Sequence, residues 1–138
     1  MISKKCKYAI KALLYLAEQQ EDRSVFSSEI AEKENIPKKF LEAILRDLRN
    51  FQLVQSRRGA HGGYRLIKKP EDITLVELMR VMDGPIALLP CVSLNYYHSC
   101  EECDEANCTI KPAFEAIRDQ TLAILKQTTI ASMRRDLL

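Results

Sequence analysis

The first third of the chain carries apolar residues at helical spacing. They recur every three or four positions over residues 8–16, while the lysines of this stretch lie largely off the apolar face, which predicts an amphipathic helix. A polar break follows at residues 21–24. Beyond it, Ser27 or Ser28 can cap a short second helix, and Asn35 closes that helix.

A third helix is predicted over residues 37–51. Pro37 suits its first turn, because a proline is tolerated where the backbone has no helical donor to lose. Phe40 or Leu41 begins an apolar stripe that continues at helical spacing. The rest of the stripe is Ile44, Leu45 and Leu48, and the other face carries Lys38, Lys39, Glu42, Arg46 and Arg49. Two helices across a short turn, the second with a basic face, are typical of a helix-turn-helix.

The stretch after the third helix has the pattern of a strand, a tight turn and a second strand. Leu53 and Val54 start the first strand, and Tyr64, Leu66 and Ile67 belong to the second. Three glycines between them supply the permissive backbone of the turn. The cations around the turn are Arg57, Arg58, His61 and Arg65. A basic hairpin directly behind a helix-turn-helix is typical of a winged helix, and its cations can reach phosphates or a narrow minor groove.

Two more helices are predicted in the second half of the chain. Thr74 and Glu77 match a capping box ahead of a helix over 75–83, which a Gly-Pro pair stops. A loop over 86–108, here called the cysteine loop, leads to a long amphipathic helix over 111–127. The predicted apolar stripe of this helix is Ile110, Ala113, Phe114, Ile117, Thr121 and Ile124, and a short terminal helix over 130–138 can follow.

The long last helix could fold back on its own domain or pair with a second copy of the chain. A small winged domain has little core left for so long a helix to cover. A pseudo-palindromic DNA operator also favours binding by a dimer with two-fold symmetry. We therefore expect a homodimer.

Composition and charge indicate where the protein is located and what kind of partner it binds. The 138 residues are 46% hydrophobic and 29% charged, and no apolar run approaches the ~18 residues that a membrane helix needs. The basic, then apolar N-terminus is interrupted by lysines and lacks a small-residue cleavage site, so we expect a cytoplasmic protein with no membrane partner. Residues 1–70 hold 15 Lys and Arg against 8 Asp and Glu, whereas residues 71–138 hold 6 against 11. A basic half joined to an acidic half favours nucleic acid as a partner on one side only.

Four of the five cysteines crowd into the polar cysteine loop with the spacing C-x8-C-x2-C-x4-C. Cys100 and Cys103 can clasp one metal, and Cys91 and Cys108 can complete a set of four sulfur ligands. This set suits tetrahedral zinc and an iron–sulfur cluster equally well, because both bind four thiolates. His98 is a further possible ligand. The fifth cysteine, on the first helix, is expected to be a packed thiol.

Other uses of the loop cysteines are a thiol redox switch, a thioredoxin-like enzyme, or no function. Acidic neighbours at 101, 102, 104 and 105 disfavour the thiolate that a redox switch needs. A thioredoxin-like enzyme needs a βαβ context that the pattern does not predict. Inert cysteines are usually buried in a core. An electron-transfer or thiol–disulfide protein would leave the basic hairpin unexplained, and no conventional catalytic constellation is present, so we do not expect an enzyme.

Four stretches of the chain match a pattern of one known family: SKKCKYAIKALLYLA, IAEKENIPKKFLEAIL, the wing RRGAHGGY, and ITLVELMRVMDGP followed by a cysteine cluster. Over nearly its whole length, the chain resembles the Rrf-two family of bacterial winged-helix transcription regulators. The family includes IscR-like iron–sulfur regulators, nitric-oxide sensors and repressors of cysteine metabolism. The resemblance implies a homodimer with crossed C-terminal helices, a recognition helix in the major groove and a wing in the minor groove.

The resemblance also bears on particular residues. Cluster-bearing members place three cysteines in this loop, with wider gaps and a non-cysteine fourth ligand, so the fourth cysteine here leaves a 2Fe-2S and a 4Fe-4S cluster both open. Glu42 falls where the family contacts DNA, and its carboxylate can accept a hydrogen bond from cytosine N4. Pattern and resemblance together make these the candidate DNA contacts: Ser28, Lys38, Lys39, Glu42, Arg46, Arg49, Arg57, Arg58, His61 and Tyr64.

The sequence as a whole predicts a mainly α protein with a small β-hairpin wing. We divide it into a winged helix-turn-helix DNA-binding domain over 1–85, the cysteine-rich metal- or cluster-binding loop over 86–108, and a dimerisation helix with a C-terminal tail over 109–138. The predicted function is a homodimeric, redox-sensing transcription regulator whose binding to a double-stranded DNA operator is modulated by an iron–sulfur cluster. A structural zinc is the leading alternative.

Overall fold

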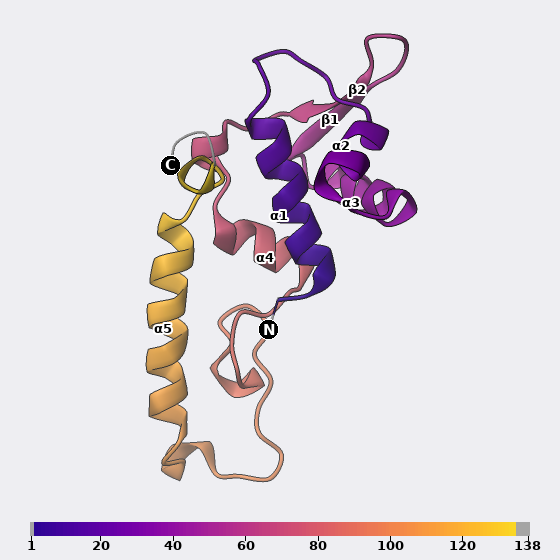
Figure 1. Cartoon of the computed structure of the whole chain (residues 1–138). Helices are drawn as coiled ribbons and strands as arrows, with labels where there is room; N and C mark the ends of the chain where they lie inside the picture. Colours follow the sequence, from indigo (N-terminus) through magenta and orange to yellow (C-terminus); the bar gives the residue numbers. More distant parts are fainter. Residues whose placement is uncertain (1, 135–138) are drawn as a thin grey trace.

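Three helices in the first third of the chain build the main core. The structure, a computed structural model, describes residues 2–134. The helices α1 (Lys4–Ala17), α2 (Ser27–Glu34) and α3 (Lys38–Asn50) follow one another in the predicted order (Figure 1). Their apolar faces meet in one cluster, whose fully buried members include Leu13, Ile30, Leu41, Ile44, Leu45 and Leu48.

The ends of α2 and the start of α3 differ in part from the prediction. The N-cap residue of α2 is Phe26, and neither Ser27 nor Ser28 caps it, because the helix already begins at Ser27. Asn35 ends α2 as predicted, with a left-handed φ of 54°. Pro37 is the N-cap residue of α3 and lies one position before the first helical turn in which it was expected.

A strand-like contact just before α2 sets the first residue at which the helix can begin. Val25 pairs with Tyr64 of the wing: the Tyr64 amide donates to the Val25 carbonyl at 2.7 Å, and the Val25 amide donates back at 2.8 Å. This bridge keeps the chain extended up to Phe26, whose φ and ψ are −68° and 147°. The helix can therefore begin only at the next residue.

The wing is a two-stranded antiparallel hairpin. β1 (Val54–Arg57) pairs with β2 (Gly63–Leu66), with Val54 opposite Leu66. Ile67, predicted to belong to the second strand, lies beyond it and is exposed. A side chain at position 63 would meet the Val25 backbone at 2.5 Å, and Gly63 has a φ of +118°. The close approach of the wing to the segment just before α2 therefore requires glycine at this position.

A fourth helix and a long fifth helix follow the wing. Thr74 is the N-cap residue of α4 (Leu75–Met82), and its hydroxyl accepts a hydrogen bond from the Glu77 amide, as the capping box predicts. α5 (Lys111–Gln127) then packs its C-terminal half against α4 through Leu122 and Leu125. The chain beyond α5 returns to the domain, where Ile130 is fully buried in the main core.

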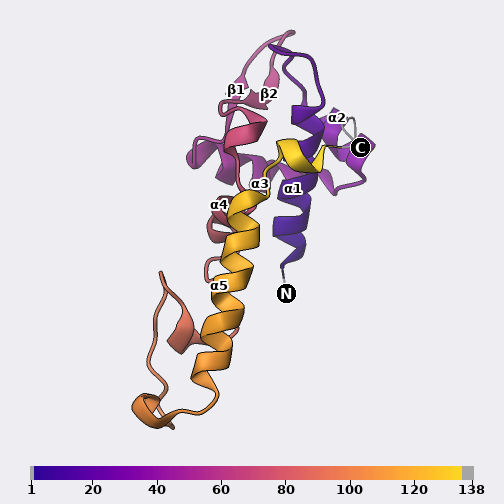
Figure 2. The same ribbon diagram turned by 90° about the vertical axis from the view of Figure 1, so that its left-hand side faces the viewer.

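The N-terminal half of α5 and the cysteine loop project together away from the winged domain (Figures 1 and 2). The loop contains two short 3-10 helices, Pro90–Val92 and Glu105–Asn107. The terminal helix predicted over 130–138 is a single 3-10 turn, Ala131–Met133, and its last four positions lie outside the described residues.

The face of α5 that its own domain buries is not the predicted stripe. Leu122 and Leu125 are buried on α4, whereas Ile117 and Ile124 are 44% and 64% exposed. Ile110, just before the helix, is 56% exposed. α5 therefore has two apolar faces, one covered by α4 and one uncovered within the chain.

Candidate nucleic-acid interface and cysteine loop

The surface of α3 that faces away from the core is basic. The buried stripe begins at Leu41, whereas Phe40 is exposed and its ring meets that of Tyr8 edge-on, with the centroids 5.6 Å apart. Glu42 is half-buried, with a carboxylate oxygen 3.5 Å from the Ser27 hydroxyl of α2. The exposed cations of α3 are Lys38, Lys39, Arg46 and Arg49, and Ser28 is exposed in the first turn of α2.

The tip of the wing carries a second group of exposed cations. Arg57, Arg58 and His61 are all exposed. Arg65 points back to the body of the protein and pairs with Asp22 at 3.2 Å. Tyr64, a predicted DNA contact, is half-buried and packs against the main core.

The basic face and the wing tip lie at the same end of the molecule. Figures 1 and 2 show the hairpin tip and the α2–α3 pair on the side remote from the cysteine loop. A helix that enters a major groove beside a wing that follows a phosphate backbone requires this arrangement.

The thiols of the cysteine loop are neighbours. Cys100 and Cys103 are exposed, and Cys91 and Cys108 are half-buried. The pKa of Cys103 is raised to about 12, first by a hydrogen bond with Cys100, then by burial and by the charges of Cys100, Cys108 and Cys91. Cys100, Cys108 and Cys91 therefore all lie within electrostatic reach of Cys103. A thiol with so high a pKa is a poor nucleophile at neutral pH.

The donor set fits a sulfur-liking metal or cluster, but it is not gathered into a closed site. Four thiols suit tetrahedral zinc or an iron–sulfur cluster. Over residues 2–134, no three His, Cys, Asp or Glu side chains converge as metal ligands do. His98, the possible extra ligand, is exposed and lies 4.0 Å from a carboxylate oxygen of Glu101. The thiols would have to draw together to bind a metal.

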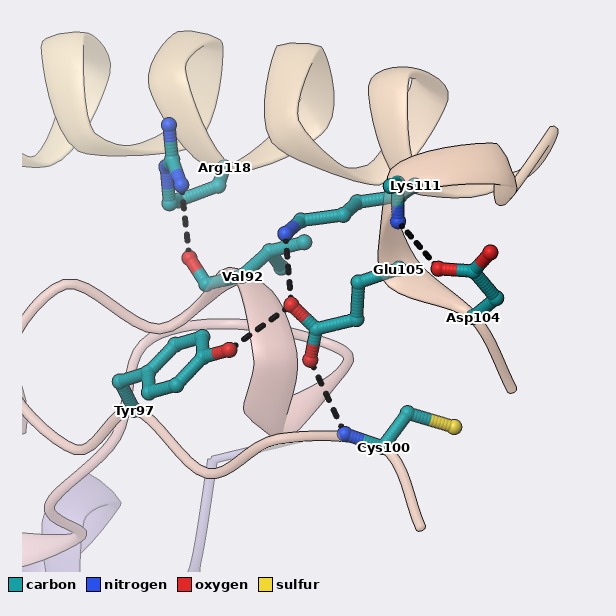
Figure 3. A network of polar contacts seen from close by, with 8 residues as sticks. Val92, Tyr97, Cys100, Asp104, Glu105, Lys111 and Arg118 are labelled. Carbon is teal, nitrogen blue, oxygen red and sulfur yellow. Dashed lines mark hydrogen bonds and ion pairs between the residues drawn. The ribbon is translucent and has the colours of Figure 1, made fainter. Parts of the chain in front are cut away.

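Glu105 organises the cysteine loop (Figure 3). One of its carboxylate oxygens accepts hydrogen bonds from the Tyr97 hydroxyl at 2.7 Å and from the Lys111 ammonium at 3.0 Å. The other accepts from the backbone N–H of Cys100 at 3.0 Å. These donors, Tyr97 first, then the Cys100 amide and Lys111, lower the pKa of Glu105 to about 2.

A second contact joins the beginning of the loop to α5 (Figure 3). Arg118 donates to the backbone carbonyl of Val92 at 2.8 Å, next to Cys91. The same guanidinium pairs with Asp119 at 2.9 Å, which holds it in place. We did not predict a function for Glu105 or Arg118 from the sequence. Lys111 was the signal in the sequence that pointed to Glu105. A cation in the first turn of a helix is disfavoured by the helix macrodipole, so it calls for a nearby carboxylate.

Cys6 is the packed thiol that the sequence predicts. It is fully buried in the main core. Burial first, and then the charge of Asp83, raise its pKa to about 11. Asp83 also accepts a hydrogen bond from the Ser3 amide at 3.0 Å, so the start of α1 is tied to the end of α4.

None of the helices within residues 2–134 combines the length and the apolar composition that crossing a bilayer would take.

Comparison with known proteins identifies relatives over almost the full length. The family model Rrf2, described as an iron-dependent transcriptional regulator, matches residues 2–136. A Rhodobacter capsulatus protein described as an rrf2-like HTH-type transcriptional regulator is 44% identical over 137 residues, which cover 96% of this chain and 91% of that protein.

Solved structures agree with the family model. CymR, the global cysteine regulator of B. subtilis, superposes with a TM-score of 0.79 at 30% identity, covering 96% of this chain and 95% of that one. T. potens IscR superposes with a TM-score of 0.78 at 27% identity, covering 100% of this chain and 88% of that one. The chain therefore belongs to the Rrf-two (Rrf2) family, and it is a winged-helix DNA-binding transcription regulator and not an enzyme.

Proposed function

We propose that this regulator is a homodimer that binds a duplex DNA operator and that its loop cysteines hold an iron–sulfur cluster which modulates that binding. The observation that carries the proposal is that Cys103 lies within electrostatic reach of the other three loop thiols, in a loop remote from the basic end of the molecule. A sensor site and a DNA-binding surface at opposite ends of one chain suit a regulator whose affinity for DNA follows the state of the sensor.

The DNA-binding part of the proposal assigns α3 to the major groove and the wing to the minor groove. Lys38 and Lys39, at the exposed start of α3, are positioned to contact phosphates. Glu42 can accept a hydrogen bond from cytosine N4 and repels phosphate, so it favours sequence discrimination over affinity. Arg57 and Arg58 at the wing tip match the negative potential of a narrow minor groove.

The dimer part rests on the uncovered face of α5. Ile110, Ile117 and Ile124 are spaced seven residues apart and are all exposed. Apolar residues at this spacing form the seam along which two helices pair. A second copy of the chain is the partner that fits, since the operator of a two-fold regulator presents two equivalent half-sites.

The cluster part assigns Cys91, Cys100, Cys103 and Cys108 as ligands. When bound, an iron–sulfur cluster supplies a state that depends on iron supply and on oxidants. The chain's own contribution is to keep the thiols close, through the Glu105 contact to the Cys100 amide and the Arg118 contact beside Cys91. Zinc would use the same thiols, and it would make the loop a structural element instead of a sensor.

The test is metal analysis of protein purified without oxygen. We expect a coloured protein with iron and acid-labile sulfide in the wild type and in a Cys6→Ala control, and loss of both in Cys100→Ser and Cys103→Ser. One zinc per chain in a colourless protein would refute the cluster and retain a structural metal. Neither metal, with failure of reconstitution from iron and sulfide, would refute any metal function and revive the thiol switch.

The DNA part is tested independently with the same protein. Selection from a random-sequence duplex library should yield a pseudo-palindromic site. A regulator acts where the chromosome is, so the proposal also assigns the protein to the cytoplasm. Failure to enrich any duplex, in the presence and absence of cluster, would contradict the proposed interface.

A further inference from the structure

Two cations of α5 hold the two ends of the cysteine loop (Figure 3). Lys111, the first residue of the helix, pairs with Glu105 at 3.0 Å. Arg118 donates to the Val92 carbonyl at 2.8 Å. The two cations are seven residues apart, so they lie on one face of α5, roughly 10 Å from each other along its axis. The loop is thereby fastened to the helix at two separate points.

Lys111 occupies a helix position that disfavours positive charge. It stands in the first turn of α5, where the macrodipole disfavours a cation, and α5 has no acidic residue in that turn. Glu105 supplies the missing carboxylate from the loop. The side chains of Lys111 and Glu105 are 23% and 22% exposed, so this pair is less screened than a pair on open surface. The Arg118 side chain is 15% exposed.

Glu105 is also bonded to the backbone of one loop cysteine. It lies between Cys103 and Cys108 in the chain, and its second oxygen accepts from the Cys100 amide. Drawing the four thiols together to ligate a metal would displace the backbone at Cys100 relative to α5. Because Glu105 bonds both the Cys100 amide and Lys111, that displacement would be passed to the first turn of α5.

We propose that Glu105, Lys111 and Arg118 are positioning residues, here called the latch, which couple the arrangement of the loop thiols to the N-terminal half of α5. The proposal rests on the proposed metal site. It adds the route by which that site acts on the helix that carries the exposed isoleucines. The C-terminal half of α5 is anchored on α4 by Leu122 and Leu125, so the latch acts on the half that projects.

The first experiment needs no metal. Hydrogen exchange is measured by mass spectrometry on the full chain, metal-free and reduced, for the wild type and Glu105→Gln. In Glu105→Gln we expect exchange of residues 97–108 and of the first turns of α5 to become about tenfold faster. The reason is that the Cys100 amide and Lys111 lose their charge-assisted hydrogen bonds to the Glu105 carboxylate. Glu102→Gln, the same change in the same loop, should leave both segments unchanged.

A second variant, at the other contact between the loop and α5, tests whether the result for Glu105→Gln is only a local effect of that substitution. Arg118→Gln should speed exchange around Val92 and in the adjacent turns of α5, whereas Lys126→Gln, farther along the same helix, should not. Exchange in the wing and in α1 should stay as in the wild type for all four variants. Unchanged exchange in Glu105→Gln and Arg118→Gln, or a change confined to the loop without α5, would overturn the latch.

The third experiment adds one equivalent of Zn²⁺ as the probe. In the wild type we expect slower exchange in both the cysteine loop and the first turns of α5. In Glu105→Gln, which keeps all four thiols, we expect slower exchange in the loop alone. If Zn²⁺ protects α5 equally in the variant, the latch is refuted and the metal site stands. If Zn²⁺ protects neither segment in the wild type, the metal site fails, and the metal-free comparison still decides whether the latch exists.

Discussion

Replacing Gly63 with alanine should destabilise the protein much more than the same change at Gly59. Both glycines have a positive φ, +118° at Gly63 and +101° at Gly59. A Cβ at Gly59 meets nothing within 4 Å, whereas a Cβ at Gly63 would lie 2.5 Å from the carbonyl carbon and oxygen of Val25. The two substitutions therefore share the backbone strain and differ in the steric overlap.

The magnitude follows from the contacts that must shift. Strain from a left-handed φ costs about 1–2 kcal/mol at either position. At Gly63 the backbone must also retreat by about 0.9 Å to restore ordinary contact, which disrupts the two hydrogen bonds between Val25 and Tyr64. At roughly 0.5–1.5 kcal/mol each, these bonds add about 1–3 kcal/mol. We expect a loss of about 2–5 kcal/mol for Gly63→Ala and about 1–2 kcal/mol for Gly59→Ala.

Urea unfolding followed by circular dichroism, at one fixed protein concentration, measures both losses. Concentration must be fixed because dimer formation contributes to the apparent stability. Losses that agree within about 0.5 kcal/mol would show that the contact between the wing and Val25 relaxes freely, and the reasoning from the overlap would be wrong.

Three further predictions concern the DNA-binding surface, the uncovered face of α5 and a polar network. In Arg57→Gln, log K for duplex DNA should fall less steeply with log salt, by about 0.9 in slope, because one phosphate contact is lost. Arg80→Gln on α4 should leave the slope unchanged. Equal slopes for the wild type and Arg57→Gln would remove the wing from the interface. Ile117→Lys should convert a dimer to a monomer in light scattering with the fold retained in circular dichroism, and an unchanged mass would exclude this face as the dimer seam. A hydrogen bond from Arg23 is the main cause that lowers the pKa of Glu29 from its ordinary 4.5. The stability that the Glu29 carboxylate contributes is therefore present above that value and is lost as the pH falls through the lowered pKa. The difference in unfolding free energy between wild type and Glu29→Gln should be constant above about pH 5 and shrink below it, and a difference that grows in acid would contradict this sign.

Much of the fold was predictable because its signals are local. The apolar periodicity of α1 and α3, the capping box at Thr74 and the glycines of the wing each act within a few residues. The boundaries were less accurate where a distant segment intervened. The extended chain at Phe26, and hence the start of α2, depends on the bridge from Val25 to Tyr64, which joins residues far apart in the sequence.

The same division holds for the functional surfaces. The sequence was sufficient to indicate a basic helix beside a basic hairpin, and a loop with four cysteines, because charge and ligand type are properties of the residues themselves. It could not separate Glu105 from its acidic neighbours, since its three hydrogen-bond donors, Tyr97, the Cys100 amide and Lys111, come together only in the folded loop.

α5 shows most directly what only the tertiary structure decided. Its sequence determined a long helix with apolar residues on more than one face, because helical periodicity is local. Which face is buried depends on the surface that α4 presents and on the return of the chain to bury Ile130. Packing therefore placed Leu122 and Leu125 inside and left Ile117 and Ile124 exposed for a partner, a choice between two apolar faces that no local pattern could make.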